Sequence, residues 1–184
     1  MSSLRVPVAP RDHVLGSPNA ELTLVEYGDY ECPSSAAVHA TIGQLRRRFA
    51  GRLRYVYRHF PVTEQHRCAV LAAEAAEAAN AQGQFWEMHD MLFAQQYALD
   101  AEQLLRYGTW IGLDVVRMRH ELEAHAYMRR IRDDFTGGLR SGVTITPSLF
   151  FNGRRHEGPS DVASLTLALE RAQRSPTPVQ DTQH

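Results

Sequence analysis

Short segments of strand character stand at both ends of the chain, on either side of a long block of helical periodicity. Leu22–Tyr27 and Leu53–Phe60 are rich in β-branched and aromatic residues with charges at intervals, which is typical of strands. Ser34–Phe49 predicts a helix between them. Strand character returns at Thr144–Asn152, and Asp161–Ala172 has the spacing of an amphipathic helix. This order predicts an α/β fold with an all-α block inside it.

The central block, residues 64–140, is predicted to be helical throughout. Glu64–Gln82 is dense in alanine, which has the highest helix propensity, and Gly83 is placed to end that helix. Asp100 and Asp114 are candidate N-caps of later helices. Apolar stripes at helical spacing predict buried faces: Phe85, Met88, His89 and Leu92; Val115, Met118 and Leu122; Tyr127, Ile131 and Phe135.

Composition and charge narrow the classes of partner. The chain has 184 residues, and its 20 Lys and Arg against 21 Asp and Glu give a formal net charge of −1. This balance indicates neither a nucleic acid nor an anionic membrane surface as a partner. No apolar stretch approaches the roughly 20 residues of a membrane span, and residues 1–10 lack the apolar core of a secretory signal. We therefore expect a cytoplasmic protein without a structural disulfide.

Cys32 is the first candidate for chemistry. It follows a predicted strand, and Pro33 suits the first position of a helix because its missing N–H would be unpaired there. Cys32 is then the N-cap, where unpaired backbone N–H groups and the helix dipole favour a nucleophilic thiolate. In a Cys-x-x-Cys redox motif the second cysteine would stand where this chain has Ser35. Because a lone cysteine is most often a small buried apolar residue, this short motif is a weak signal by itself.

The second candidate lies near the far end of the chain. Thr146-Pro147 stands directly before an apolar strand, which an Asn152-Gly153 turn follows. A proline in this setting is a candidate cis-proline, and cis bonds in folded proteins usually serve a structural purpose.

With both candidates in place, the chain resembles the DsbA-like branch of the thioredoxin superfamily. The resemblance implies a thioredoxin-like fold with a helical insertion, Cys32 at the active-site position, and Thr146-Pro147 as a cis-proline loop that binds substrate beside it. Ser35 departs from the family by replacing its second redox cysteine, and Ile145 stands where a small residue is common. The matching segments are Val25–Pro33, Tyr57–Pro61, Phe85–His89, Thr146–Pro147 and Phe150–Gly153.

The resemblance also divides the chain into parts. The thioredoxin-like core is expected in two pieces, with the helical insertion between them. An N-terminal arm rich in proline and small polar residues precedes the core, and a disordered tail follows it. The predicted boundaries are 1–18 for the arm, 19–63 and 141–174 for the core, 64–140 for the insertion and 175–184 for the tail.

Glu26 is the third site residue, six positions before Cys32. The resemblance places an acidic residue here beneath the active site, where a buried carboxyl group with a raised pKa would transfer protons to and from the thiol. The alternative is a strand glutamate paired with Arg54 or Arg58 of the neighbouring strand, and the two interpretations have equal weight.

Ser35, Cys68 and the histidines complete the site predictions. Ser35 either donates a hydrogen bond to the Cys32 thiolate or occupies a site without turnover. Cys68, near the start of the alanine-rich helix, is expected to pack against the insertion rather than react. The nine histidines show no metal-ligand spacing along the chain, so we predict no metal site.

Three functions agree with these residues. The first is a thiol-disulfide oxidoreductase that acts through Cys32 alone, with Pro33, Thr146 and Pro147 binding substrate and an external thiol releasing the mixed disulfide. It needs no bound cofactor, and its partners are a thiol- or disulfide-bearing protein or glutathione as co-substrate. The second is a redox-silent module that binds peptides or proteins. The third is a glutathione-binding transferase or isomerase, which would use Ser34 or Ser35. We favour the first, because a purely structural site has no need of a cysteine at the helix cap.

Overall fold

The computed structural model describes residues 3–174. In this part of the chain, one five-stranded sheet has the order β1-β3-β2-β4-β5. The strands are β1 (His13–Leu15), β2 (Leu22–Gly28), β3 (Leu53–His59), β4 (Ser148–Phe151) and β5 (Arg154–Arg155). The helices are α1 (Pro33–Arg48), α2 (Ala69–Asn80), α3 (Phe85–Ala94), α4 (Ala101–Trp110), α5 (Val115–Glu123), α6 (Met128–Arg140) and α7 (Val162–Arg174).

The centre of the sheet is the parallel pair β2 and β3, joined by the crossover helix α1. β1 pairs antiparallel with β3, and β4 pairs antiparallel with β2. Most residues of β2 and β3 are buried, which is expected for strands covered on both faces. The fold is therefore mixed α/β, with strands from the two ends of the chain side by side.

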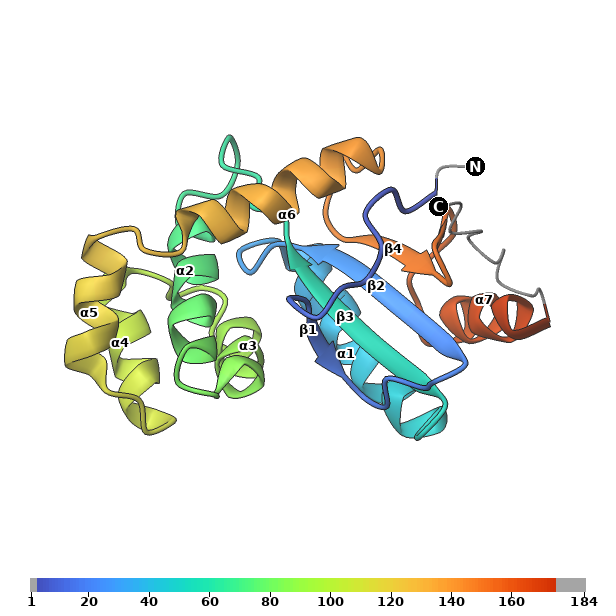
Figure 1. Cartoon of the computed structure of the whole chain (residues 1–184), viewed down its shortest axis with the longest axis horizontal. Coiled ribbons are helices and arrows are strands. Elements are labelled where there is room, and N and C mark those ends of the chain that lie inside the picture. The colour runs from blue at the N-terminus through green and yellow to red at the C-terminus, as the bar shows by residue number, and fades with distance from the viewer. Residues whose placement is uncertain (1–2, 175–184) are drawn as a thin grey trace, which may run out of the picture.

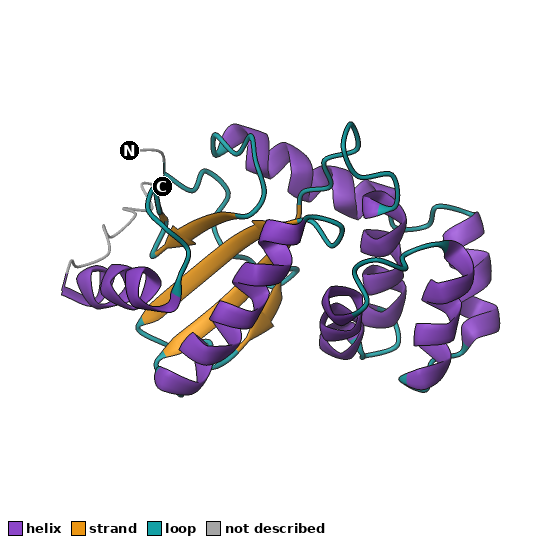
Figure 2. Ribbon diagram, turned by 180° about the vertical axis from the view of Figure 1, so that it is seen from behind, coloured by secondary structure: helices purple, strands orange, loops and turns teal. Residues whose placement is uncertain are grey.

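Each face of the sheet packs against its own apolar cluster. Leu22 and Leu24 of β2 share a cluster with residues of α1 and α7, which cover one face (Figure 2). Val25 and Tyr27 point to the other face, where the partners include Phe135 of α6 and apolar residues of the N-terminal segment. Successive side chains of β2 point to opposite faces of the sheet. Glu26 therefore lies on the same face as Leu22 and Leu24, under α1.

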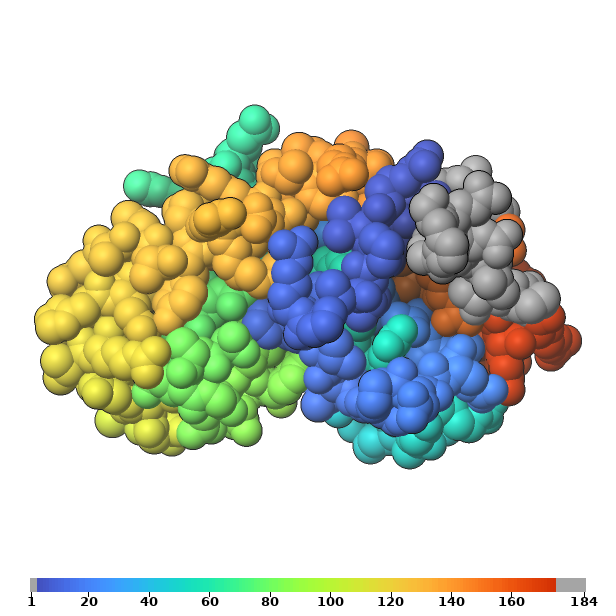
Figure 3. All heavy atoms as spheres, in the orientation of Figure 1, coloured from blue at the N-terminus to red at the C-terminus, as the bar shows by residue number. Residues whose placement is uncertain are grey.

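Most of the helical insertion, α2 to α5, lies beside the sheet, whereas α6 packs on the face opposite α1. Helices α2 to α6 all fall between β3 and β4 in sequence, and α2 to α5 form a separate group next to the sheet (Figure 1). α2 contacts α3, α5 and α6, and its buried alanines allow close approach. The N-terminal segment crosses in front of β2 and β3 and reaches the boundary between the insertion and the core (Figure 3).

Several element boundaries differ from the sequence prediction. The alanine-rich helix begins at Ala69 instead of Glu64, because the Asp29 carboxylate accepts hydrogen bonds from Val62 N and from the His66 ring, and these hold the preceding residues in turns. The last long strand begins at Ser148, since the residues before it form the Thr146–Pro147 loop.

Three findings concern the predicted arm, the predicted tail and the possibility of a membrane span. β1 lies inside residues 1–18, for which the sequence predicted only an arm. The predicted tail, residues 175–184, lies outside the described residues. Within residues 3–174, no helix has the length and apolar character needed to cross a membrane.

Candidate active site

Cys32 lies at the junction of β2 and α1, as the N-cap of the helix, with Pro33 in the first turn. Its backbone is extended, with φ −78° and ψ 117°, and its side chain is buried with 8% of its surface exposed. The Sγ atom donates a hydrogen bond to the carbonyl oxygen of Thr146 at 3.4 Å. The thiol thus sits at the positive end of α1 and in contact with the second candidate segment.

The Thr146–Pro147 peptide bond is cis in this structure. The antiparallel pairing of β4 with β2 ends at Ser148 opposite Tyr27, so the two residues before Ser148 lie just past the end of β2. The loop that leads to Cys32 begins at this end of β2, which explains how Cys32 and Thr146 meet although they are 114 positions apart. Thr146 and Pro147 are half-buried, Pro33 is exposed, and Ile145 is 64% exposed. The predicted substrate-binding residues therefore lie on both sides of the thiol.

Ser35 is fully buried, and its Oγ atom accepts a hydrogen bond from Asp29 N at 3.4 Å. This contact holds the loop between β2 and α1. The bond from Ser35 to the Cys32 sulfur stays a prediction. Both cysteines are free thiols in the structure.

Glu26 is fully buried on the α1 side of the sheet. Burial raises the pKa of its carboxyl group to about 7, although the hydrogen bond that the Tyr55 hydroxyl donates at 2.6 Å lowers it. Its Oε1 atom has no partner among the described residues. The alternative pairing with Arg54 or Arg58 is wrong, because Arg54 donates to Thr23 Oγ1 and Arg58 pairs with Asp12 at 2.8 Å. Near neutral pH, Glu26 can both accept and donate a proton.

Gly28 explains how Glu26 and Tyr57 fit so closely together at the end of β2. A Cβ atom at Gly28 would lie 2.6 Å from the Tyr57 ring and 2.9 Å from Glu26 Oε1. A larger residue would displace one of these two side chains. Glycine at this position therefore maintains the packing above the buried carboxyl group.

Asp29 is a site residue that the sequence analysis missed. Its Oδ1 atom accepts from Glu31 N, and its Oδ2 atom accepts from Val62 N and pairs with His66, each at 2.8 Å. Asp29 is 2% exposed. It fixes the loop that carries Cys32 to the loop after β3. A single Asp in a turn gives no sequence signal for contacts so far along the chain.

Gln96 and Glu31 were missed in the same way. The Gln96 side chain, which follows α3, donates to the carbonyl oxygens of Tyr30 at 2.9 Å and Cys32 at 2.7 Å. The Glu31 carboxylate accepts from Cys68 N at 2.6 Å, at the start of α2. Together with the bond between His66 and Asp29, these contacts hold the insertion to the active-site loop at several points.

Cys68 is the N-cap of α2 and is half-buried against the large apolar cluster. Burial, followed by the nearby carboxylates of Glu31 and Asp100, raises the pKa of its thiol. A higher pKa leaves less thiolate at neutral pH and so lowers reactivity. These observations agree with the predicted packing role of Cys68.

The fold and this site define a thioredoxin-fold protein of the DsbA-like type, with a helical insertion and a cysteine facing a cis-proline loop. The sequence model of the Thioredoxin family matches residues 8–171, and the chain belongs to that family.

Solved structures agree in fold. BdbD from Bacillus subtilis superposes with a TM-score of 0.86 at 19% identity, covering 95% of this chain and 99% of that one. A thioredoxin-like oxidoreductase from Silicibacter pomeroyi gives 0.81 at 27% identity, covering 91% and 95%. The α-DsbA1 protein of Wolbachia pipientis gives 0.79 at 21% identity, covering 93% and 94%.

Curated relatives are similar over a part of their length. The Na(+)/H(+) antiporter NhaA 1 of Mycobacterium sp. (strain KMS) is 45% identical over 167 residues, which are 89% of this chain and 27% of that protein. The chain spans about a quarter of the length of the curated relatives it matches.

Proposed function

We propose that this chain is a thiol-disulfide oxidoreductase that acts through Cys32 alone. The observation that supports this most directly is the position of Cys32 Sγ, at the helix cap and 3.4 Å from the Thr146 carbonyl oxygen. A substrate segment lying along Thr146 in extended form would hold its sulfur next to Cys32. The similarity to the thioredoxin-like oxidoreductase from Silicibacter pomeroyi supports the same class of reaction.

The proposed reaction is two successive exchanges. The Cys32 thiolate attacks one sulfur of a substrate disulfide, forms a mixed disulfide, and the other substrate sulfur leaves as a thiolate. A thiolate from outside the chain then attacks the mixed disulfide, takes over the substrate sulfur in a new disulfide, and Cys32 leaves as a thiolate. The external thiol is required because Ser35, where a second cysteine would attack, has a hydroxyl group instead.

The partners in this proposal are a disulfide-bearing protein and a small thiol such as glutathione. No bound cofactor is required, because both exchanges use only thiols and disulfides. Glu26 is proposed to take up or release the proton of the departing or attacking thiol, since a carboxyl group with a pKa of about 7 is suited to transfer in either direction. A cytoplasmic location stays a prediction.

The test is adduct formation with glutathione disulfide. The reduced protein is incubated with it and analysed by intact mass spectrometry, alongside Cys32→Ser and the matched control Cys68→Ser. We expect one glutathione adduct on the unmodified chain and on Cys68→Ser, none on Cys32→Ser, and release of the adduct when reduced glutathione is added.

A turnover assay separates the proposal from its alternatives. The substrate is a peptide–glutathione mixed disulfide, and the unmodified chain should accelerate release of the peptide thiol over the rate with Cys32→Ser. A chain that binds the peptide without forming an adduct would instead be the redox-silent module. Turnover that survives in Cys32→Ser but is lost in a Ser34→Ala, Ser35→Ala variant would favour the transferase or isomerase.

A further inference from the structure

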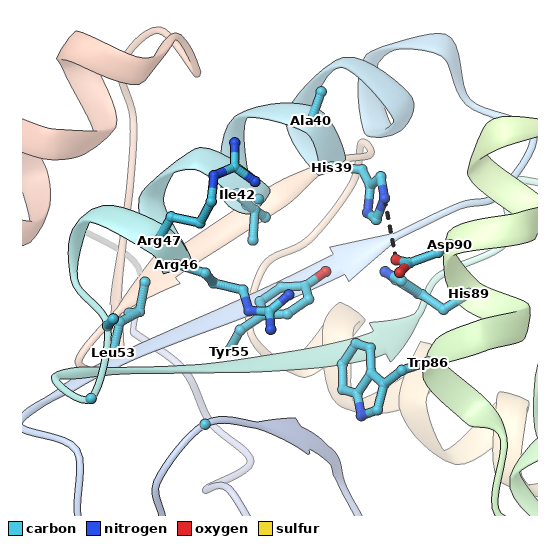
Figure 4. Close-up of a pocket in the computed structure, with 14 residues that line it drawn as sticks. His39, Ala40, Ile42, Arg46, Arg47, Leu53, Tyr55, Trp86, His89 and Asp90 are labelled. Atoms are coloured by element: carbon cyan, nitrogen blue, oxygen red, sulfur yellow. Dashed lines mark ion pairs between the residues drawn. The ribbon is translucent and has the colours of Figure 1, made fainter.

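A second polar cluster lies away from Cys32, where α1 faces α3. A cleft of about 800 Å³ is lined by α1, by the loop and strand β3 that follow it, and by α3. At one end of it, His39 of α1 lies next to His89 and Asp90 of α3 (Figure 4). His39 Nε2 is 3.4 Å from Asp90 Oδ1, and the centroids of the two imidazole rings are 5.1 Å apart. One potential ligand atom from each of the three side chains lies within 4.8 Å of the other two.

His89 brings an unpartnered nitrogen to this cluster. Its ring is 1% exposed, and its Nδ1 atom shares a hydrogen bond with the Tyr30 hydroxyl at 3.0 Å. Its Nε2 atom is buried and has no hydrogen-bond partner among the described residues. Most buried ring nitrogens are paired, so an unpaired one in the wall of a cleft and beside two other potential ligands is a candidate ligand atom.

We propose that His39, His89 and Asp90 bind a divalent zinc ion, with a fourth coordination position open to the cleft. Two imidazole nitrogens and one carboxylate oxygen are a typical ligand set for zinc sites that keep a position free. The Tyr30 hydroxyl would act as the outer partner that orients a zinc-binding histidine. When the Tyr30 hydroxyl oxygen accepts a hydrogen bond from Nδ1–H, the lone pair of the His89 ring is at Nε2.

Access and charge are consistent with a site reached from solvent. The side chains of Asp90 and His39 are 69% and 28% exposed, so an ion would meet these ligands first and the buried His89 last. Arg46 also lines the cleft, and its positive charge opposes a cation. The Asp90 carboxylate offsets this charge next to the ligand atoms, where the Coulomb interaction is strongest.

A second group of potential ligands, His13, His59 and Glu77, is a weaker candidate. Both histidine Nε2 atoms already bond to Glu77 Oε1, at 2.7 and 2.9 Å. The Arg130 guanidinium lies 3.6 Å from the same oxygen. His59 Nδ1 is also buried without a hydrogen-bond partner among the described residues, but the two Nε2 atoms and Glu77 Oε1 that would meet at an ion are already paired with one another.

Zinc binding at the proposed site would join the insertion to the helix that carries Cys32. α3 belongs to the insertion and α1 to the thioredoxin core, and the two helices contact each other. An ion held by both helices would restrict movement of one against the other. Bound zinc should therefore raise the temperature at which the chain unfolds.

The test is zinc titration by isothermal calorimetry, with both cysteines alkylated beforehand so that no thiolate binds the metal. The site variants are Asp90→Asn and His39→Gln, which change exposed or partly exposed side chains and leave the buried His89 in place. The matched controls are Asp133→Asn and His120→Gln, on other surfaces of the molecule. Circular dichroism spectra check that all the variants are folded.

We expect one zinc ion per chain in the unmodified protein and the controls, and affinity weakened by at least about tenfold in each site variant. Tyr30→Phe, which removes only the outer hydroxyl, should weaken binding by about 10–100-fold. Zinc should raise the melting temperature of the controls more than that of the site variants. Absence of zinc binding to the unmodified chain, or unchanged binding in Asp90→Asn and His39→Gln, would overturn the proposal.

Discussion

Replacing Glu26 with glutamine should remove a dependence of stability on pH. In the folded chain, burial raises the pKa of this carboxyl group from 4.5 to about 7. The folded state therefore prefers the protonated form, and the unfolded chain loses the proton at lower pH. The stabilisation is complete below about pH 4.5, is lost as the pH rises toward about 7, and stays lost above it. Glutamine has nearly the same shape and does not titrate.

The magnitude follows from the two pKa values. Each pKa unit corresponds to about 1.4 kcal/mol, so the difference between 4.5 and about 7 gives about 3 kcal/mol. We expect the stability of Glu26→Gln, relative to the unmodified chain, to increase by about 3 kcal/mol between about pH 4 and about pH 8. The difference in unfolding free energy between the two proteins at a single pH also contains the cost of burying an amide. Only the change of this difference with pH measures the titration of the carboxyl group.

The assay is urea denaturation followed by circular dichroism at both pH values. Other groups titrate in this range, including His13, whose pKa burial lowers, but they are common to both proteins and cancel in the difference. The matched control is Glu21→Gln, which removes a surface carboxylate paired with Arg52 at 2.6 Å and should change stability by about 0–1 kcal/mol. A relative stability of Glu26→Gln that is equal at both pH values would refute the argument.

Three further predictions concern the loop around Cys32. Iodoacetamide at neutral pH should modify Cys32 before Cys68, although Cys68 is more exposed. The reason is that burial and two carboxylates raise the pKa of the Cys68 thiol. Peptide mapping that finds Cys68 modified first would contradict this prediction. Ser35→Cys should form a disulfide with Cys32, since residues three apart at a helix start have Cα atoms within the required distance of about 7 Å, and the oxidised variant should show no free thiol at these positions. Gln96→Ala should lower the free energy of unfolding by about 1–3 kcal/mol by leaving the Tyr30 and Cys32 carbonyls unpaired, whereas the exposed neighbour Gln95→Ala should have little effect in the same urea titration.

Sequence patterns were sufficient to predict the features that interactions between neighbouring residues control. Asp100 and Asp114 cap their helices by accepting from backbone N–H groups two and three residues on, as the sequence predicts. The apolar stripe of α3 is buried for the same reason, because residues at helical spacing share one face. Cys32 was placed at its helix cap from its neighbours alone.

Where contacts between distant residues decide the structure, no local pattern in the sequence reveals them. The start of α2 shifted because Asp29 holds the preceding turn. One of the two interpretations of Glu26 paired it with Arg54 or Arg58 of the next strand, yet its hydrogen-bond partner is the Tyr55 hydroxyl of that strand. His39, His89 and Asp90 were not expected together, because adjacent residues on one helix and a residue on another helix do not form a recognised metal-ligand spacing.

The loop that holds Cys32 has consequences for the order of folding. Its contacts reach residues 37, 64 and 114 positions away, through Glu31 to Cys68, through Cys32 to Gln96 and through Cys32 to Thr146. Closing such long loops costs chain entropy before the contacts form, which makes them slow. During synthesis, the Cys32 thiol leaves the ribosome long before Thr146 does, so its contact with the Thr146 carbonyl oxygen forms only after residues up to β4 have been made.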